Sequence, residues 1–327
     1  MAEKTLIEVV NDGLRDELRR DERTFILGED VAEGGVFKAT EGLFDEFGEK
    51  RVIDMPLAEA AIVGISIGAS LNGLLPIAEI QFADFIHPAF DQIVSEAARL
   101  HYRSNGTWSC PITIRTPYGA GIHGGPYHSQ SIEAFYAHVP GLKVICVGSP
   151  YDAKGLLKSA IRDPNPVLFL EHKKAYRLFR EEVPEDEYTI PIGKAAVKRE
   201  GSDITLVTYG LMTRHSLEAA ETLQSEDGVS VEVIDLRTVS PWDKERVLES
   251  VRKTGKALIV YEDNITGGFG AEVAATIAEE AFDYLDGPVT RIASPDVPIA
   301  PYSGILEEYV LPNPAKIAEG IRKLAGY

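Results

Sequence analysis

The sequence predicts an α/β protein of two domains, each built on a largely parallel sheet. Short apolar runs alternate with helical patterns from end to end, which is typical of parallel strands joined by helices. A charged, proline-bearing stretch at 171–191 interrupts this alternation once, and the alternation then restarts. With 327 residues the chain is long enough for two cores. We therefore predict a first domain at 1–185, a linker at 186–200 and a second domain at 201–327.

The first domain begins with an amphipathic helix over 5–20, because its leucine and valine positions fall on one stripe. Short apolar runs bounded by glycine, proline or charged residues predict buried strands between the later helices. In chain order, the remaining elements predicted are a strand 25–27, helix 58–71, strand 76–81, helix 88–103, strand 111–115, strand 144–147, helix 152–162 and strand 167–170.

The second domain repeats the same alternation with elements of similar length, and no fixed-period repeat relates them. Its elements are predicted as strand 204–208, helix 213–224, strand 229–234, helix 242–251, strand 257–261, helix 270–282, strand 289–292 and a terminal helix 314–324.

The composition excludes several classes of protein. Lys+Arg 33 against Asp+Glu 51 gives a net charge of −18, which argues against nucleic acid as a partner and suits a basic protein partner. The most apolar stretch, 60–75, is too short and too polar to span a membrane. Cys110 and Cys146 are the only cysteines, too few for a disulfide framework. With no signal peptide apparent, these features predict a cytoplasmic protein.

Glu59 stands at the head of a predicted helix that carries few other charges. Pro56 suits the first turn, and apolar residues follow Glu59. Two interpretations stay open: a carboxylate favoured by the helix dipole, or a carboxyl group that shares a proton with a ligand nitrogen. Gly64 and Gly68 recur on one side of this helix, which allows close packing either on the chain's own sheet or on another subunit.

A glycine-rich loop with two histidines follows the strand at 111–115. Its first six residues match G-x-G-x-x-G, but Gly125 and Pro126 follow where a dinucleotide site needs a helix, so we exclude a nicotinamide site. His123 and His128 are then solvated loop residues, acid/base or hydrogen-bonding groups in a cleft, or zinc ligands together with His138. No acidic or cysteine ligand lies nearby in the sequence, which disfavours zinc.

Several runs in the same order resemble one family over essentially the whole chain. The family is the beta subunit of the thiamine-diphosphate-dependent, decarboxylating 2-oxo acid dehydrogenases. The runs most similar to its branched-chain members are Gly34–Phe37, Ile80–Asp84 and Tyr127–Ser131. The other matching runs are Leu27–Val31, Asp54–Gly64, Glu79–Asp84, His101–Ser104, Asp152–Leu156 and Asp235–Thr238.

The resemblance implies a transketolase-type pyrimidine-binding domain followed by a transketolase-type C-terminal domain. It also implies an alpha subunit in an α2β2 heterotetramer that shares thiamine diphosphate with this chain and holds most of the Mg²⁺. The sequence agrees, because the Gly-Asp-Gly motif that anchors the diphosphate and Mg²⁺ in thiamine enzymes is absent. The implied reaction is oxidative decarboxylation of a branched-chain 2-oxo acid and acyl transfer to a lipoyl domain of a dihydrolipoyl acyltransferase core.

Carried over position by position, the resemblance assigns roles to individual residues. Glu59 would bind N1′ of the aminopyrimidine and share a proton with it, and His128 would contact the substrate or help acyl transfer. The other cofactor-binding residues implied are Glu29, Leu57, Ala58, Gln81 and Phe85, and the substrate residues are Phe82, Phe85, Tyr127 and His128. A monovalent cation, K⁺, would be held mostly through backbone oxygens by Ile112, Ala160, Ile161, Asp163 and Asn165.

Two alternatives stay open beside the branched-chain enzyme. Pyruvate and acetoin dehydrogenase beta subunits are close enough in sequence to share most of these runs. A non-catalytic scaffold of the same fold would also assemble with partners, but it would have no need of Glu59 or His128.

Overall fold

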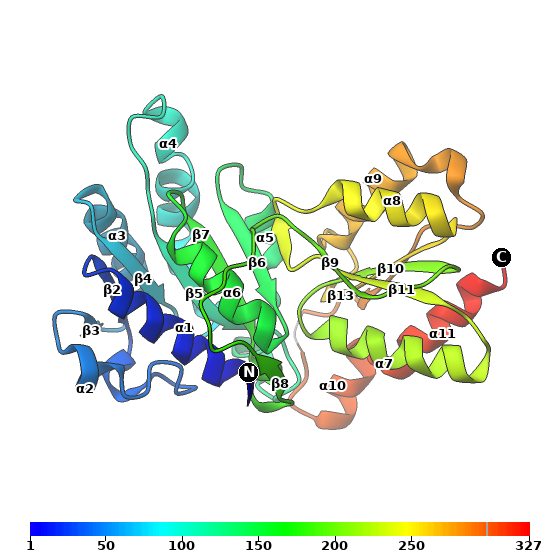
Figure 1. The fold of residues 1–327 in the computed structure, drawn as a ribbon, viewed down its shortest axis with the longest axis horizontal. Helices are drawn as coiled ribbons and strands as arrows, with labels where there is room; N and C mark the ends of the chain where they lie inside the picture. Colours follow the sequence, from blue (N-terminus) through cyan, green and yellow to red (C-terminus); the bar gives the residue numbers. More distant parts are fainter. Residues whose placement is uncertain (299) are drawn as a thin grey trace. The chain divides into compact units, whose positions relative to one another are not determined.

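The computed structural model describes residues 1–298 and 300–327, which form two compact units. The first unit comprises Met1–Tyr118 and Phe135–Ile192, and the second comprises Gly119–Ala134 and Gly193–Tyr327 (Figure 1). The loop 119–134 thus packs with the second unit although it lies inside the range 1–185. The domain boundaries at 185 and 201 stay a prediction.

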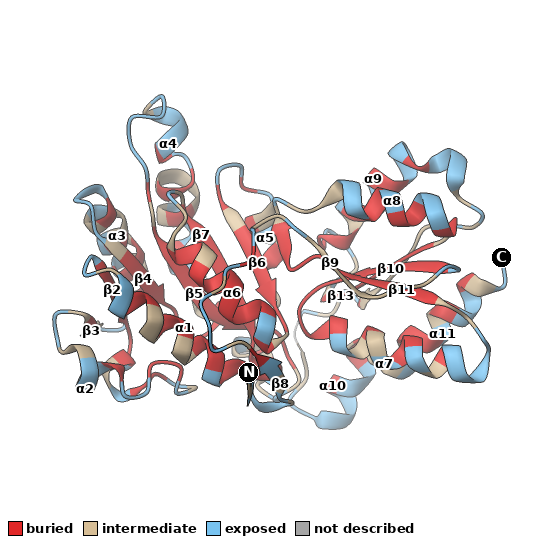
Figure 2. Ribbon diagram, viewed as in Figure 1, coloured by how far each residue is buried: buried red, intermediate tan, exposed pale blue. Residues whose placement is uncertain are grey.

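The first unit is built on a parallel sheet with the strand order β6-β7-β5-β4-β2-β3. The strands are almost wholly buried, as Figure 2 shows, which explains why they appear in the sequence as short apolar runs. They span β2 Thr24–Gly28, β3 Val52–Asp54, β4 Leu75–Glu79, β5 Thr113–Tyr118, β6 Lys143–Val147 and β7 Val167–His172.

Helices α1 and α6 pack against each other beside this sheet. The predicted stripe of α1 is confirmed, since its leucines and valines are buried. Thr5 starts α1 with a capping box, in which its backbone N–H donates to Glu8 at 2.7 Å. The helices of this unit are α1 Leu6–Arg20, α2 Leu43–Phe47, α3 Glu59–Leu71, α4 Leu100–Arg103 and α6 Pro150–Ile161, with α5 Glu133–Ala137 at its boundary.

One sequence prediction for this unit is wrong in detail. The helix predicted at 88–103 is broken into a 3-10 turn at His87–Ala89, a π-helical turn at Gln92–Ala97 and α4. The prediction missed this break because a change in the number of residues per turn cannot be seen in the spacing of apolar residues. The charged stretch from 171 onward is also structured: β7 runs to His172, and β8 Glu181–Val183 pairs antiparallel with β1 Ala2–Lys4.

The second unit has a sheet with the order β14-β13-β10-β11-β9, parallel except for β9. Helices α7 and α11 cover one face and α8 and α9 the other (Figure 1). The strands of this sheet are β9 Ala196–Arg199, β10 Ile204–Thr208, β11 Val231–Asp235, β13 Ala257–Asn264 and β14 Thr290–Ser294, and the short strand β12 Thr238–Ser240 lies outside it. The helices are α7 Leu211–Glu226, α8 Lys244–Thr254, α9 Gly270–Glu280, α10 Gly304–Val310 and α11 Pro314–Ala325.

The α/β architecture predicted from the alternation is therefore confirmed in both units. Within the described ranges, no helix combines the length and the apolar character needed to cross a bilayer.

Candidate active site

Two buried carboxyl groups lie together at the carboxyl edge of the first sheet. Glu29 follows β2 directly, and Glu59 is the first residue of α3; they are 7% and 8% exposed. Burial raises the pKa of Glu29, the nearby Glu59 and Asp30 raise it further, and the Ala58 backbone N–H, which donates to Glu29, partly offsets this. The Glu29 carboxyl group therefore keeps its proton to a higher pH than an exposed carboxyl group does.

The hydrogen bonding of this pair is incomplete within the described residues. Oε1 of Glu29 is buried and accepts no hydrogen bond there. The Glu59 carboxylate likewise forms neither a hydrogen bond nor an ion pair with the described part of the chain. A buried carboxyl oxygen without a partner costs stability, so Oε1 of Glu29 suits a hydrogen-bond donor from outside this chain.

Other residues predicted to bind the cofactor lie around this pair. Ala58 is the N-cap residue of α3, and Leu57 is 79% exposed, so the chain leaves the Leu57 side chain uncovered. Gln81 follows β4 and donates from Nε2 to Asp30 at 2.9 Å. The structure thus brings Glu29, Leu57, Ala58, Glu59 and Gln81 to one edge of the sheet.

Phe82 and Phe85 belong to an aromatic cluster that the sequence did not reveal. Phe82 meets Phe85 at a centroid distance of 5.6 Å and Phe37 at 5.3 Å, and Phe37 in turn meets Tyr176 at 5.2 Å. The cluster forms an apolar wall next to Gln81. Phe37 and Tyr176 come from loops distant in the sequence, and only the fold shows that they meet.

A buried ionic cluster lies next to these aromatic residues, and the sequence analysis did not predict it. Arg115 on β5 donates to Glu171 on β7 at 2.8 and 2.6 Å, and it also pairs with Glu79 on β4. The Tyr176 hydroxyl donates to Glu171 at 2.6 Å. Burial raises the pKa of Glu79, against the opposing effect of Arg115. The cluster joins three neighbouring strands at the edge that carries the site.

His128 and Tyr127 lie in the loop of the second unit, so they are described separately from Glu59. His128 is half-buried and Tyr127 is 66% exposed. His123 has a positive φ of 60° and pairs through Nδ1 with Glu307 at 2.6 Å. The described residues contain no group of three or more His, Cys, Asp or Glu side chains arranged for a metal ion, so the zinc alternative gains no support.

The residues predicted to hold a monovalent cation come together at the end of α6. Ala160 and Ile161 are buried there, and the Asp163 carboxylate accepts from the Asn165 backbone N–H at 2.9 Å. Ile112 lies beside the segment 163–165, since the N–H of the nearby Cys110 donates a hydrogen bond to the carbonyl of Pro164 at 3.1 Å. Oδ1 of Asn165 is buried and accepts no hydrogen bond within the described ranges. The arrangement leaves an acceptor available to a cation.

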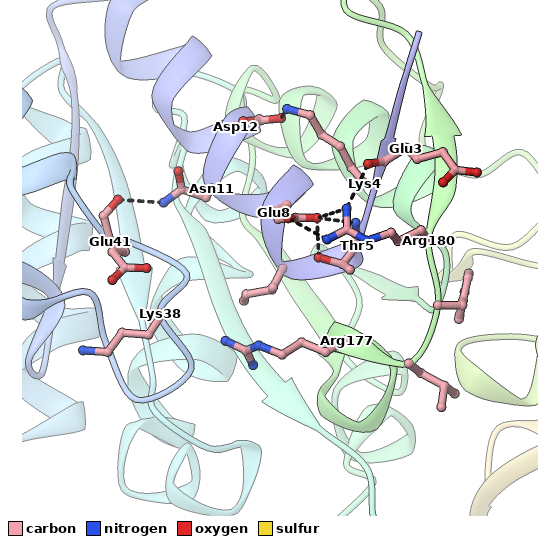
Figure 3. A pocket seen from close by; sticks show the side chains of 13 residues that line it. Glu3, Lys4, Thr5, Glu8, Asn11, Asp12, Lys38, Glu41, Arg177 and Arg180 are labelled. Carbon is pink, nitrogen blue, oxygen red and sulfur yellow. Dashed lines mark hydrogen bonds and ion pairs between the residues drawn. The ribbon is translucent and has the colours of Figure 1, made fainter.

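A cavity of about 720 Å³ in the first unit contains none of the predicted site residues (Figure 3). Its charges are largely matched within its own walls: Lys4 pairs with Asp12, and Arg180 pairs with Glu8 at 3.1 Å. Hydrogen bonding from the Thr5 backbone N–H is the largest factor that lowers the pKa of Glu8. Since it lies apart from the carboxyl pair, we assign the chemistry to the sheet edge rather than to this cavity.

The second unit contains a separate cluster of three carboxyl groups. Glu133 is fully buried and accepts from the Tyr209 hydroxyl at 3.0 Å, and its pKa is raised well above the ordinary value by burial and by Asp263. Burial also raises the pKa of Asp263 to about 6, with a further contribution from Glu262.

This cluster predicts a pH-dependent stability for the second unit. Because the folded state of Asp263 binds its proton more tightly than the unfolded state, the stability that it contributes is present at low pH and is lost as pH rises from about 4 to about 6. Asp263→Asn should therefore be more stable than the unmodified chain at pH 7.5. A shift of about two pH units corresponds to about 3 kcal/mol at full burial, and solvent screening at this half-buried side chain reduces the expected gain to about 1–2 kcal/mol.

The measurement is the thermal midpoint of the full-length chain between pH 4.5 and 7.5, with the exposed Asp283→Asn as a control. The advantage of Asp263→Asn should shrink toward pH 4.5. An advantage that is absent, or that is the same at every pH, would contradict the role given to Asp263.

Comparisons with known proteins cover the whole chain. The transketolase pyrimidine-binding domain family matches residues 2–178, and the transketolase C-terminal domain family matches residues 193–317. The chain is 56% identical to the 2-oxoisovalerate dehydrogenase subunit beta of Bacillus subtilis (strain 168), over 100% of both chains. It is 50% identical to the pyruvate dehydrogenase E1 component subunit beta of the same organism, over 99% of both. It is 52% identical to the mitochondrial 2-oxoisovalerate dehydrogenase subunit beta 2 of Arabidopsis thaliana, covering 98% of this chain and 89% of the relative.

Solved structures agree with this fold. A split gene transketolase, described as an inactive beta4 tetramer, superposes with a TM-score of 0.79 at 25% identity over 99% of both chains. Transketolase from Leishmania mexicana gives a TM-score of 0.72 at 16% identity, over 100% of this chain and 46% of that one. The two transketolase-type domains predicted from the sequence are confirmed.

Proposed function

Because the chain belongs to the family of 2-oxo acid dehydrogenase beta subunits, we propose that its carboxyl-rich sheet edge binds the pyrimidine half of thiamine diphosphate. We propose further that it acts in the oxidative decarboxylation of branched-chain 2-oxo acids and in acyl transfer to a lipoyl domain. The observation that carries the proposal is Glu59, a buried carboxyl group at the head of α3 beside Glu29, with no hydrogen-bond partner in the described residues.

The residues at this edge fit an aminopyrimidine. A ring nitrogen would give the Glu59 carboxyl group the partner that it lacks, and an amino group would satisfy the buried Oε1 of Glu29. The apolar wall of Phe82 and Phe85 would lie against the ring. When bound, thiamine diphosphate supplies the electron sink that makes loss of carbon dioxide from a 2-oxo acid feasible.

The protein's own part in this chemistry is to hold a proton and to contact the substrate. Glu59, which is buried at the start of α3, would share a proton with the ring nitrogen N1′. Glu29 keeps its own proton to a raised pH, which limits the negative charge next to Glu59. His128 and Tyr127, which the loop of the second unit presents, would contact the 2-oxo acid or the acyl group that leaves.

An alpha subunit would supply the other half of the site, including most of the Mg²⁺ ligands. Helix α3 supports this proposal, because a Cβ atom added at Gly64 or Gly68 would meet nothing within 4 Å in the described chain. The interpretation that these glycines pack on the chain's own sheet is therefore disfavoured. Ile65 and Leu71 on the same helix are 49% and 45% exposed, which leaves an apolar face for another subunit in an α2β2 assembly.

Three further proposals follow from the same family. The acidic chain, with a net charge of −18, suits a basic binding domain on an acyltransferase core. The buried Oδ1 of Asn165 and the backbone oxygens near it suit K⁺. The two free cysteines are buried, which fits a reducing compartment such as the cytoplasm.

The alternatives differ in what they require of the structure. Pyruvate and acetoin dehydrogenase subunits would use the same Glu59 and differ only in the acyl pocket. A scaffold would gain nothing from a buried carboxyl pair in which Oε1 of Glu29 accepts no hydrogen bond from the described residues, since such an oxygen only reduces stability.

The proposal is tested by mixing the chain with its alpha partner, thiamine diphosphate, Mg²⁺ and an oxidised lipoyl domain as the acyl acceptor, and by measuring carbon dioxide release from a 2-oxo acid. Turnover is expected from the mixture and not from either chain alone, and both chains should co-elute on size exclusion. Equal turnover from this chain alone would contradict a shared site, and a co-eluting but inactive mixture would favour the scaffold.

A further inference from the structure

The loop that carries His128 is held by two buried carboxylates of the second unit. We propose that Glu262 and Glu307 are positioning residues, which hold the loop 119–131 in the conformation that presents His128 to the substrate. The inference rests on the proposed function, because it deepens the role given there to His128.

Glu262, on β13, holds both ends of the loop. Its Oε1 accepts the backbone N–H of Ala120 at 2.6 Å and the hydroxyl of Ser131 at 3.2 Å. The side chain is 6% exposed, so these hydrogen bonds to a carboxylate are sheltered from competing water. The Gly119 N–H also donates to the carbonyl of Gln130 at 2.9 Å, which closes the loop between the same two points.

Glu307, on α10, holds the middle of the loop. Its Oε1 accepts the Gly121 N–H at 2.9 Å and its Oε2 pairs with His123 at 2.6 Å, while the residue is only 2% exposed. His123 has a left-handed backbone, which costs free energy for a residue with a side chain and persists only where the surroundings impose it. The pair with Glu307 is a contact that helps to hold His123 in this conformation.

The loop has little room to adopt another shape while these contacts hold. A Cβ at Gly125 would lie 2.2 Å from the ring of Tyr302, and a Cβ at Gly124 would lie 2.7 Å from the Cβ of His128. His128 is therefore packed on the backbone of its own loop, and the loop is fastened at 120, 121, 123 and 131. A displacement of about 1 Å in a positioned group can reduce turnover about 100-fold.

The first experiment measures the loop itself. Glu307→Ala and Glu262→Ala should each increase amide hydrogen exchange at 119–131 in the full-length chain by about 10-fold or more. Glu307→Gln should keep most of the protection, because its amide oxygen still accepts from Gly121. Glu308→Ala removes an exposed carboxylate from the same helix and should change nothing. Unchanged exchange at the loop in Glu307→Ala and Glu262→Ala would overturn the inference.

The second experiment asks whether these residues act through His128. In the assembled enzyme with its alpha partner, Glu307→Ala should lower kcat about 10-fold to 100-fold, and Glu307→Gln should restore most of it. In a double variant with His128→Ala the two losses should not multiply, because the loop then has no histidine to position.

The outcomes of this cycle separate the two proposals. A double variant no slower than His128→Ala alone supports the inference. Losses that multiply would overturn the inference and leave the role of His128 intact. A His128→Ala variant with unchanged turnover would show that the proposed role of His128 fails, and the inference would fail with it.

Discussion

Replacing Glu59 by glutamine is expected to abolish decarboxylation by the assembled enzyme while leaving its assembly intact. Glutamine has the shape of glutamate but cannot hold or give a proton at the position where the ligand nitrogen would lie. Acid/base groups of this kind typically accelerate a reaction about 10²-fold to 10⁴-fold, so we expect the decarboxylation rate to fall about 10³-fold. Because Glu59 forms no hydrogen bond with the described chain, the fold should tolerate the change.

The measurement is exchange of the C2 proton of thiamine diphosphate in the mixture of this chain with its alpha partner. Glu59→Gln should slow this exchange about as much as it slows turnover. Glu33→Gln, an exposed carboxylate near the same edge, is the control and should exchange normally. Normal exchange in Glu59→Gln would refute the role given to Glu59.

The second large effect is expected on stability, from Arg115→Leu. This change removes the cation that lies between Glu79 and Glu171, and it leaves two carboxylates buried without a counter-charge. Breaking a buried ionic cluster in this way costs about 3–5 kcal/mol. The loss should be smaller at pH 5 than at pH 8, because burial raises the pKa of Glu79 and its protonation removes a buried charge.

The comparison is made on thermal unfolding of the full-length chain at both pH values. Arg103→Leu serves as the control, since it breaks an exposed pair with Glu96 that contributes at most about 1 kcal/mol. If Arg115→Leu were no less stable than Arg103→Leu, the cluster would not be what joins the three strands.

The sequence predicted what depends on local pattern. Apolar alternation identified the strands of both sheets, and the apolar run after Glu59 predicted a helix with Glu59 in its first turn, as the structure confirms. Pro56, which we expected in that first turn, lies before the helix instead. Each of these patterns involves residues that are close together in the sequence, so a short stretch of chain is enough to predict the element.

Contacts between distant segments were not visible in this way. Arg115 and Glu79 are 36 residues apart and meet because they are register partners on β5 and β4. Glu307 lies 186 residues from the loop position that it holds. Each of these residues looks in the sequence like an ordinary charge at the end of an element, and only the parallel register or the packing of the second unit gives it a partner.

The measurement that tests the central claim most directly is steady-state decarboxylation by this chain with its alpha partner, thiamine diphosphate, Mg²⁺ and an oxidised lipoyl domain as acceptor, comparing 3-methyl-2-oxobutanoate with pyruvate. The proposed function predicts a higher kcat/KM for the branched acid. A preference for pyruvate would contradict the branched-chain assignment, and no decarboxylation of either acid would contradict the active site itself.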